Sequence, residues 1–366
     1  MPMKAATRAQ PANKVSAEAP LTIGGLGVCC LAGNTPFALL GAVATHISGA
    51  AADERFSLPI PGTEEEAAIL TAPVAGLEDF EDPHLRMGTL AQTALAQALA
   101  TLPEDFAWDE LLILTLVPEE QASRGFHPQA LEQLKQDLVA LGDDLGRAEF
   151  RFVSPAEGAV AHLQAACAEL REGKWRALLF GGVDSLVDLV SCSLLARQGH
   201  LATTASSDGL MPGEGAAYLL IQQDAAAASL AQLVGMGSAA EPHAGDAADK
   251  PMTGLAAAVE SALAAQSLAP PAMECVVAPH DGSLSGALEW HQTVERLFPR
   301  REAAPRAFEE LLPCRSLGEV GATALPLSLA LGCARFEFAH PRVGYVMVCE
   351  TGDRPRRGAV LLSLHG

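Results

Sequence analysis

Short apolar runs alternate along the chain with stretches in which apolar residues recur every three or four positions. The short runs predict buried β-strands, and the periodic stretches predict amphipathic helices. We expect strands at residues 21–31, 110–117 and 176–180, with a turn at 32–34 and a glycine pair at 181–182 that closes the last strand. This alternation is typical of an α/β protein whose strands are mostly buried.

Three helices follow from the same periodicity. Residues 86–100 place one apolar face together, made of Met87, Leu90, Ala91, Ala94, Leu95 and Ala98. Residues 160–170 turn four side chains inward, namely Val160, Leu163, Cys167 and Leu170. Residues 130–144 predict a surface helix with four inward leucines, at positions 131, 134, 138 and 141.

The second half of the chain repeats the order of the first. Four stretches of the second half correspond in order to four of the first. The pairs are AQLVGMGSAAEPHAGD with LTIGGLGVCCLAGN, ECVVAPHDGSLSG with ELLILTLVPEEQ, SLGEVGATALPLSLALGC with SPAEGAVAHLQAACAEL, and GYVMVCETG with RALLFGGVD. Such internal similarity predicts a duplicated arrangement. We expect one compact unit built from residues 21–225 and 226–366, preceded by a disordered leader at 1–20.

Composition and charge disfavour some classes of binding partner. The chain has 366 residues and a formal net charge of −20, which disfavours binding to nucleic acid or to an anionic membrane. No apolar run is long enough to cross a bilayer. The eight cysteines show no paired spacing, so we expect reduced cysteines that pack as small apolar residues in a cytoplasmic protein. Cys29 and Cys30 should point to opposite faces of their strand.

A small-residue segment precedes the apolar run at 216–221. Gly213 and Gly215 flank Glu214 there, which predicts a strand whose backbone begins pressed against another chain segment. A plain turn before a strand is the alternative.

Four stretches together resemble the β-ketoacyl-acyl-carrier-protein synthases of the thiolase superfamily. They are TIGGLGVCCLAGNTP, AACAELREGKWRALLFGGVDSL, SSDGLMPGEGAAYLLIQ and RSLGEVGATAL, and their order matches from about Leu21 to the C-terminus. The resemblance implies an α/β, duplicated five-layer thiolase fold (αβαβα) with mixed sheets. It also implies dimerisation through the strand at 149–153.

In that family a cysteine at a strand-to-helix turn attacks a thioester, and two histidines assist decarboxylation. A gap-free count back from Gly181 places Ala156 at the nucleophile position, and a methyl group cannot form a thioester. Ser154 lies two residues away. It reads as a helix N-cap with Glu157 as a capping-box partner, in preference to a nucleophile.

The resemblance places the two histidines at His280 and Glu319. His280 ends an apolar strand and precedes Asp-Gly, so it is either a retained functional group or an exposed loop residue. Glu319 would repel an enolate unless it is protonated. It reads equally as a helix N-terminal residue or as a partner of Arg315. The family's Gly-Phe-Gly-Gly turn is replaced by residues 350–354.

We therefore expect a catalytically degenerate ketosynthase-like protein that is inactive in condensation and uses no cofactor. Its expected partner is an active ketosynthase, in a heterodimer of the chain-length-factor kind in fatty-acid or polyketide-type biosynthesis. A homodimer is the alternative assembly, and an acyl chain or acyl-CoA is a candidate ligand. The net charge argues against direct docking of an acidic acyl carrier. Two alternatives stay open: a thiolase-fold scaffold, and an acyl thioesterase-like enzyme that uses His280 and Glu319.

A metal site could be drawn from His280, Glu289 and His291. Their spacing matches no standard zinc pattern and Trp290 separates two of them, so we interpret these side chains as solvated helix residues with no metal.

Overall fold

A computed structural model describes residues 20–60, 62–120, 122, 124–197, 201–206, 209–223, 229–244, 250–279, 282–298, 308–352 and 355–364. Residues 1–19 of the leader expected at 1–20, the boundary at residues 225 and 226, and His280 all lie outside the described residues.

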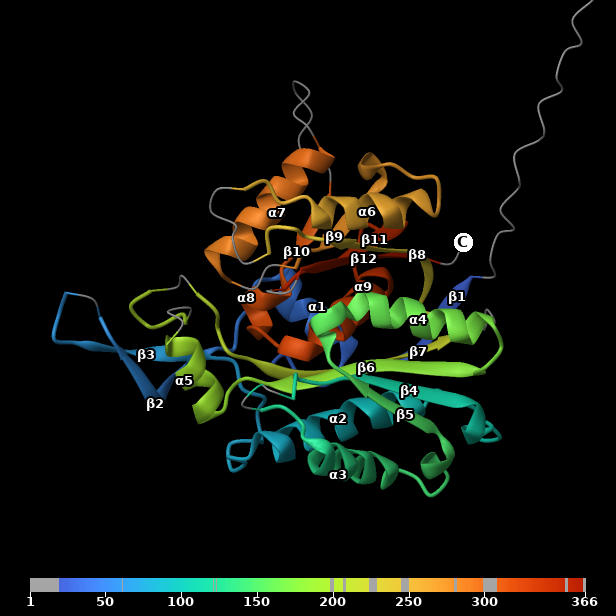
Figure 1. The fold of residues 1–366 in the computed structure, drawn as a ribbon, viewed down its shortest axis with the longest axis horizontal. Coiled ribbons are helices and arrows are strands. Elements are labelled where there is room, and N and C mark those ends of the chain that lie inside the picture. Colours follow the sequence, from blue (N-terminus) through green and yellow to red (C-terminus); the bar gives the residue numbers. More distant parts are fainter. Residues whose placement is uncertain are drawn as a thin grey trace, which may run out of the picture.

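Ten described strands form one mixed sheet in the order β10-β9-β11-β12-β8-β1-β7-β6-β4-β5 (Figure 1). Five belong to the first half of the chain: β1 (Leu21–Cys30), β4 (Leu111–Leu116), β5 (Glu149–Val153), β6 (Ala177–Ser185) and β7 (Glu214–Gln222). Five belong to the second half: β8 (Ala231–Ala240), β9 (Cys275–Val277), β10 (Glu309–Leu311), β11 (Tyr345–Glu350) and β12 (Arg356–Ser363).

The two halves use the same strand order. The first half runs β1-β7-β6-β4-β5 and the second β8-β12-β11-β9-β10, so corresponding strands occupy corresponding places. In each half three strands are parallel, and the remaining pairs are antiparallel. The halves join where Leu21 to Ile23 pairs with Ala231 to Leu233. This arrangement confirms the duplication read from the sequence.

Helices cover the two half-sheets in three layers (Figure 1). Outside the first half lie α2 (Pro83–Leu99) and α3 (Pro128–Val139), and outside the second lie α6 (Gly254–Ala264) and α7 (Leu284–Leu297). Between the half-sheets lie α1 (Pro36–Ala44), α4 (Ala159–Arg171) and α9 (Ala324–Phe338). Three apolar clusters fill the spaces between these layers. The five-layer α/β fold is therefore confirmed.

The strands are buried on both faces, as their sequences predict. In β4, Leu112 and Leu114 pack into the central cluster, whereas Leu111 and Ile113 pack against the outer helices. Cys30 joins the central cluster and Cys29 the outer one, which confirms their opposite orientations. All eight cysteines are free, and seven are buried.

Two sequence predictions need correction. The glycines at 181 and 182 do not close β6 but lie inside it. Glycine is needed at position 181, because a side chain there would overlap the ring of Tyr218. Helix α3 ends at Val139, so Leu141 lies beyond it and is exposed, whereas Leu134 and Leu138 are buried as expected.

A smaller unit projects from the sheet. The hairpin of β2 (Ala51–Pro59) and β3 (Glu66–Thr71) packs on α5 (Leu189–Arg197) around Ile69 and Cys192 (Figure 1). Among the described residues, no helix is long and apolar enough to cross a membrane.

Candidate functional site

The turn at the nucleophile position is closed by its own hydrogen bonds. After β5 the chain makes a short 3-10 turn, η3 (Pro155–Glu157), and Gly158 with φ 98° precedes α4. The Ser154 hydroxyl accepts a hydrogen bond from the N–H of Ala156 at 3.2 Å. Ser154 therefore is a cap, as predicted, although it caps the 3-10 turn and not α4. The N–H at the nucleophile position already has a partner.

The N-terminus of α4 binds a carboxyl group from the other half of the chain. Glu350, the last residue of β11, accepts hydrogen bonds from the N–H groups of Ala159 at 2.5 Å and Val160 at 2.9 Å. Burial raises the pKa of Glu350, although these two donors and the charge of Arg357 oppose the shift. Glu350 thus satisfies the backbone donors that open the helix.

The next residue connects this point to the strand that leads to His280. The Thr351 hydroxyl donates to the carbonyl oxygen of Pro279 at 3.0 Å. The ends of β9 and β11 and the start of α4 therefore lie together. Since His280 itself lies outside the described residues, its role stays a prediction.

Glu319 lies in the loop between α8 (Pro313–Leu317) and the 3-10 turn η5 (Gly321–Thr323). Its carboxylate accepts from the N–H of Gly321 at 2.8 Å. Its backbone pairs with the glycine-rich segment, because its N–H donates to Met211 at 2.7 Å and its carbonyl accepts from Gly213 at 2.9 Å. Arg315 is exposed at the surface.

The close approach predicted for the glycines is confirmed. A side chain at Gly213 would overlap the carbonyl oxygen of Leu317, and one at Gly215 would come within 3.0 Å of the carbonyl oxygen of Cys29. Likewise a Cβ at Gly282 would lie 2.7 Å from the carbonyl oxygen of Gly209. The loop after β9 therefore adjoins the segment that holds Glu319, and the site forms one region.

Arg124 and Asp184 form a buried ion pair in this region. The guanidinium Nε lies 2.5 Å from Asp184 Oδ1, and Asp184 Oδ2 accepts from the N–H of Ala322 at 2.8 Å. Burial lowers the pKa of Arg124, but the carboxylates of Asp184, Asp188 and Glu319 more than offset it and raise the pKa overall. Arg124 could not be identified from the sequence, because its partner lies 60 positions away.

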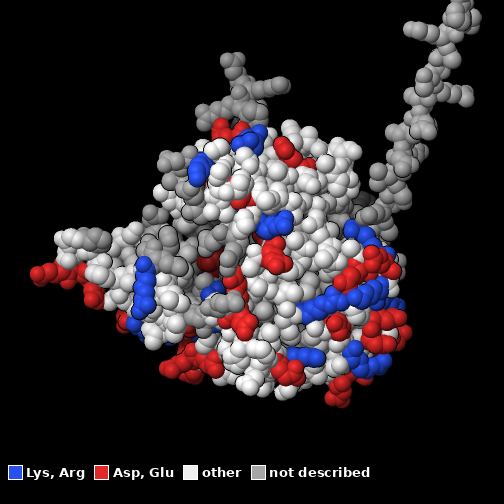
Figure 2. Space-filling view, viewed as in Figure 1, with Lys and Arg blue, Asp and Glu red and all other residues white. Residues whose placement is uncertain are grey.

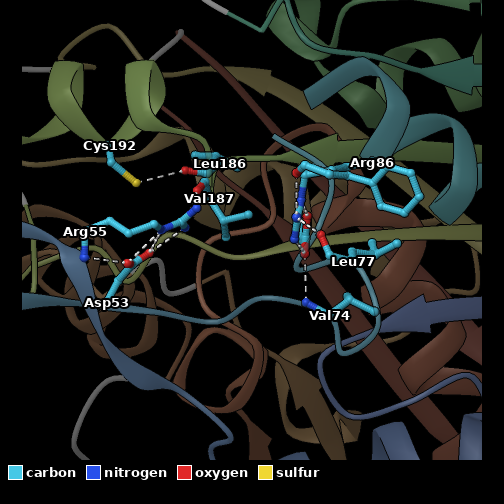
Figure 3. Close-up of polar contacts among 10 residues, drawn as sticks. Asp53, Arg55, Val74, Leu77, Arg86, Leu186, Val187 and Cys192 are labelled. Carbon is cyan, nitrogen blue, oxygen red and sulfur yellow. Dashed lines mark hydrogen bonds and ion pairs between the residues drawn. The ribbon is translucent and has the colours of Figure 1, made fainter. Parts of the chain in front are cut away.

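Glu214 is the centre of a second buried network, and Figure 3 labels two of its partners, Arg86 and Val74. Its carboxylate accepts from Arg86 Nε at 2.8 Å, from the N–H of Val74 at 2.7 Å and from the hydroxyl of Ser185 at 2.8 Å. Arg86 also donates to the carbonyl oxygen of Leu77. Both carboxylate oxygens of Glu214 accept hydrogen bonds, so this side chain joins α2, the segment before it and the end of β6.

Figure 3 also shows contacts that attach the unit of β2, β3 and α5 to the segment after β6. Arg55 forms an ion pair with Asp53 at 2.7 Å and reaches the carbonyl oxygen of Val187 at 3.5 Å. Cys192 on α5 donates to the carbonyl oxygen of Leu186 at 3.4 Å. The segment after β6 is therefore held on both sides.

Glu289 is not the solvated residue that we expected. It is 4% exposed and pairs with Arg357 at 2.5 Å, because the two come together across α7 and β12. His291 is exposed on the same helix. No group of three His, Cys, Asp or Glu side chains suited to a metal ion occurs in the part of the chain that the structure describes.

The arrangement can hold neither a thioester at Ala156 nor a second imidazole at Glu319. It retains a carboxylate at Glu319 and the turn on which the family places its nucleophile. The ends of β9 and β11 also lie beside that turn. The backbone framework is thus the one that the resemblance implies, with alanine and glutamate where the resemblance places a cysteine and a histidine.

The comparisons with known proteins agree with this framework. Residues 157–227 match the model of the β-ketoacyl synthase N-terminal domain. Over this segment the chain is similar to the N-terminal domain of β-ketoacyl synthases. The matched segment begins directly after Ala156 and includes α4, β6 and β7, so it contains Asp184 and Glu214. No curated protein has a significant sequence match to the chain.

Solved structures share the fold over nearly the whole chain. "The ishigamide ketosynthase/chain length factor" has 18% identity and a TM-score of 0.71, covering 96% of this chain and 100% of that one. A β-ketoacyl synthase from Burkholderia phymatum has 15% identity and a TM-score of 0.72, covering 95% and 100%. A third structure is the type II polyketide synthase complex AntDE:AntF, an acyl-carrier protein with its ketosynthase bound to the hexaketide. It has 14% identity and a TM-score of 0.71, and the match covers 95% of this chain and 100% of that one.

Proposed function

We propose that this chain is a non-condensing ketosynthase-like subunit that pairs with an active ketosynthase, in the manner of a chain length factor. One observation carries the proposal. The fold of solved ketosynthases is present over nearly the whole chain, but alanine stands at the position predicted for the nucleophile, and its N–H is bound to Ser154. A protein that had lost both activity and partner would have no reason to keep the turn so well supported.

The edge strand β5 supports pairing. It stands at the end of the sheet order with β4 as its described neighbour, so its other edge carries open backbone groups. The carbonyl of Val153 bonds to Val117 on the β4 side. Because N–H groups alternate sides along a strand, those of Phe150 and Phe152 point to the open edge. This is the strand through which the family is expected to dimerise.

The surface charge supports the proposal that the partner, and not this chain, binds the acyl carrier. Lys and Arg side chains gather where β4, β5 and β6 begin, but Asp and Glu are interleaved with them (Figure 2). Arg147 pairs with Asp109 at 2.9 Å and Lys174 with Glu169 at 2.7 Å. With a net charge of −20, this chain is poorly suited to dock an acidic acyl carrier, so the partner would do so. The eight free cysteines support a cytoplasmic location.

Native mass spectrometry of the protein purified from its own host tests the proposal. The expected result is a one-to-one complex with a ketosynthase that keeps its Cys-His-His set. A homodimer or an unrelated partner would contradict it and favour the scaffold function. In that case a shift in melting temperature with acyl-CoA, and hydrolysis that responds to Glu319→Gln, would reveal a thioesterase-like enzyme.

A matched pair of variants connects the complex to β5. Phe152→Pro removes the aromatic ring and the outward N–H, whereas Phe152→Ala removes the ring alone. We expect the proline variant to lose the complex and the alanine variant to keep it. Equal behaviour of the two would show that the edge of β5 is not the interface.

A further inference from the structure

The beginning of α4 carries a feature that goes beyond the missing cysteine. Two backbone N–H groups at a helix N-terminus normally favour a nearby negative charge, and in cysteine enzymes they lower the pKa of a thiol. Here both donors, from Ala159 and Val160, already bind the carboxyl group of Glu350. Glu350 comes from β11, 191 positions away from Ala159.

The surroundings fix this carboxyl group in place. A side chain at Gly358 would overlap the Glu350 carboxyl group and lie 2.6 Å from Val160 Cβ, so only glycine fits beside it. The neighbouring Thr351 is tied to Pro279. Arg357 is close enough to affect Glu350, but its guanidinium binds Glu289 at 2.5 and 3.0 Å. The contact between Glu350 and α4 is therefore built into the packing.

We propose that Glu350 closes the anion-binding start of α4, so that this site cannot activate a thiol even if the cysteine is restored. The inactive state then has two causes, the alanine at position 156 and the carboxyl group of Glu350. The second is a positioning effect, because Glu350 acts through the helix donors. The inference deepens the non-condensing function proposed above, but it concerns the isolated chain and does not need a partner.

The experiment introduces a thiol at position 156 in the full chain and follows its alkylation by iodoacetamide between pH 6 and pH 10. Mass spectrometry of the peptide separates it from the native cysteines. Burial raises the pKa of Cys167, on α4, to about 12, so this residue is a slow internal reference. In A156C we expect a thiol pKa at or above the ordinary value of about 8.5.

Removing the carboxyl group should free the donors. In A156C/E350A we expect alkylation at pH 7 to be about tenfold faster than in A156C, since a fall of one pKa unit gives ten times more thiolate. A156C/E350Q, which keeps one acceptor oxygen, should fall between the two. A156C/E157A is the matched control, because Glu157 is exposed and adjacent to position 156. It should change the rate by less than about twofold, as expected for a solvent-screened charge.

Other charged or titratable groups face this turn, and all of them except Glu157, which the control A156C/E157A removes, are common to the variants. They are Arg356 and Arg357 on β12, and Glu157 and His162 beside the turn. A low thiol pKa in A156C alone would overturn the proposal, and so would equal rates with and without Glu350. The A156C result decides the matter even if the alanine variant does not fold. Complex formation with a ketosynthase is a separate readout, so the two proposals can fail independently.

Discussion

Arg86 on α2 and Glu214 at the start of β7 form an ion pair across 128 positions of sequence, with both side chains almost fully buried. Leaving either charge buried without its partner costs about 3–5 kcal/mol. Arg86→Met and Glu214→Gln should each lower the free energy of unfolding by an amount of that order. Urea denaturation measures this directly. The pair Arg147 and Asp109 is the control, because its side chains are 58% and 63% exposed. Arg147→Ala should cost about 1 kcal/mol or less.

The glycine before Glu214 gives a second prediction. Gly213→Ala would place a methyl group against the carbonyl oxygen of Leu317, between two segments that are hydrogen-bonded to each other. Overpacking of this kind costs about 1–3 kcal/mol. Gly142→Ala is the matched control, since no atom lies within 4 Å of the added carbon. Thermal unfolding should show a lower melting temperature for the first variant alone. Equal effects would mean that the turn can move apart.

The local elements of this fold follow from the sequence because burial leaves a regular pattern. The apolar spacing in α2, the alternation in β4 and the cap at Ser154 depend on neighbours within a few positions. The path of β6 through Gly181 does not, because it depends on the ring of Tyr218 on the adjacent strand.

The family motifs predict that Ala156 and Glu319 lie in one region, and the structure pairs the backbone of Glu319 with Gly213. The ion pairs of the site could not be read in the same way. Glu350 and Ala159, or Glu289 and Arg357, meet only through the order of strands in the sheet. A charged residue in a sequence does not reveal whether it will be buried with a partner or solvated. The mistaken interpretation of Glu289 is an example.

Glu169 should stabilise the protein in a pH-dependent way. Hydrogen bonds from Arg151, then from Lys174 and Trp175, hold the pKa of Glu169 well below its usual range. A depressed pKa means that the stabilisation is present above the unfolded pKa of about 4.3 and is lost as the pH falls below it. Glu169→Gln should therefore cost about 1 kcal/mol or less at pH 7, because the cluster is partly exposed. The cost should shrink toward pH 3. A cost that is constant with pH would contradict the prediction.

The contribution of Glu350 to the free energy of unfolding should change with pH in the opposite direction. Burial raises its pKa, so the native state binds the proton more tightly than the unfolded chain does. Its contribution is therefore greatest below the unfolded pKa of about 4.3 and decreases as the pH rises toward the folded value. The difference in unfolding free energy between the native protein and Glu350→Gln should fall as the pH rises from 4 to 8, whereas that for Glu169→Gln should rise over the acid range. Urea denaturation of both variants at a series of pH values checks the two slopes together. A rising difference for Glu350→Gln would mean that the N–H groups of Ala159 and Val160 stabilise the charged carboxylate more than burial opposes it.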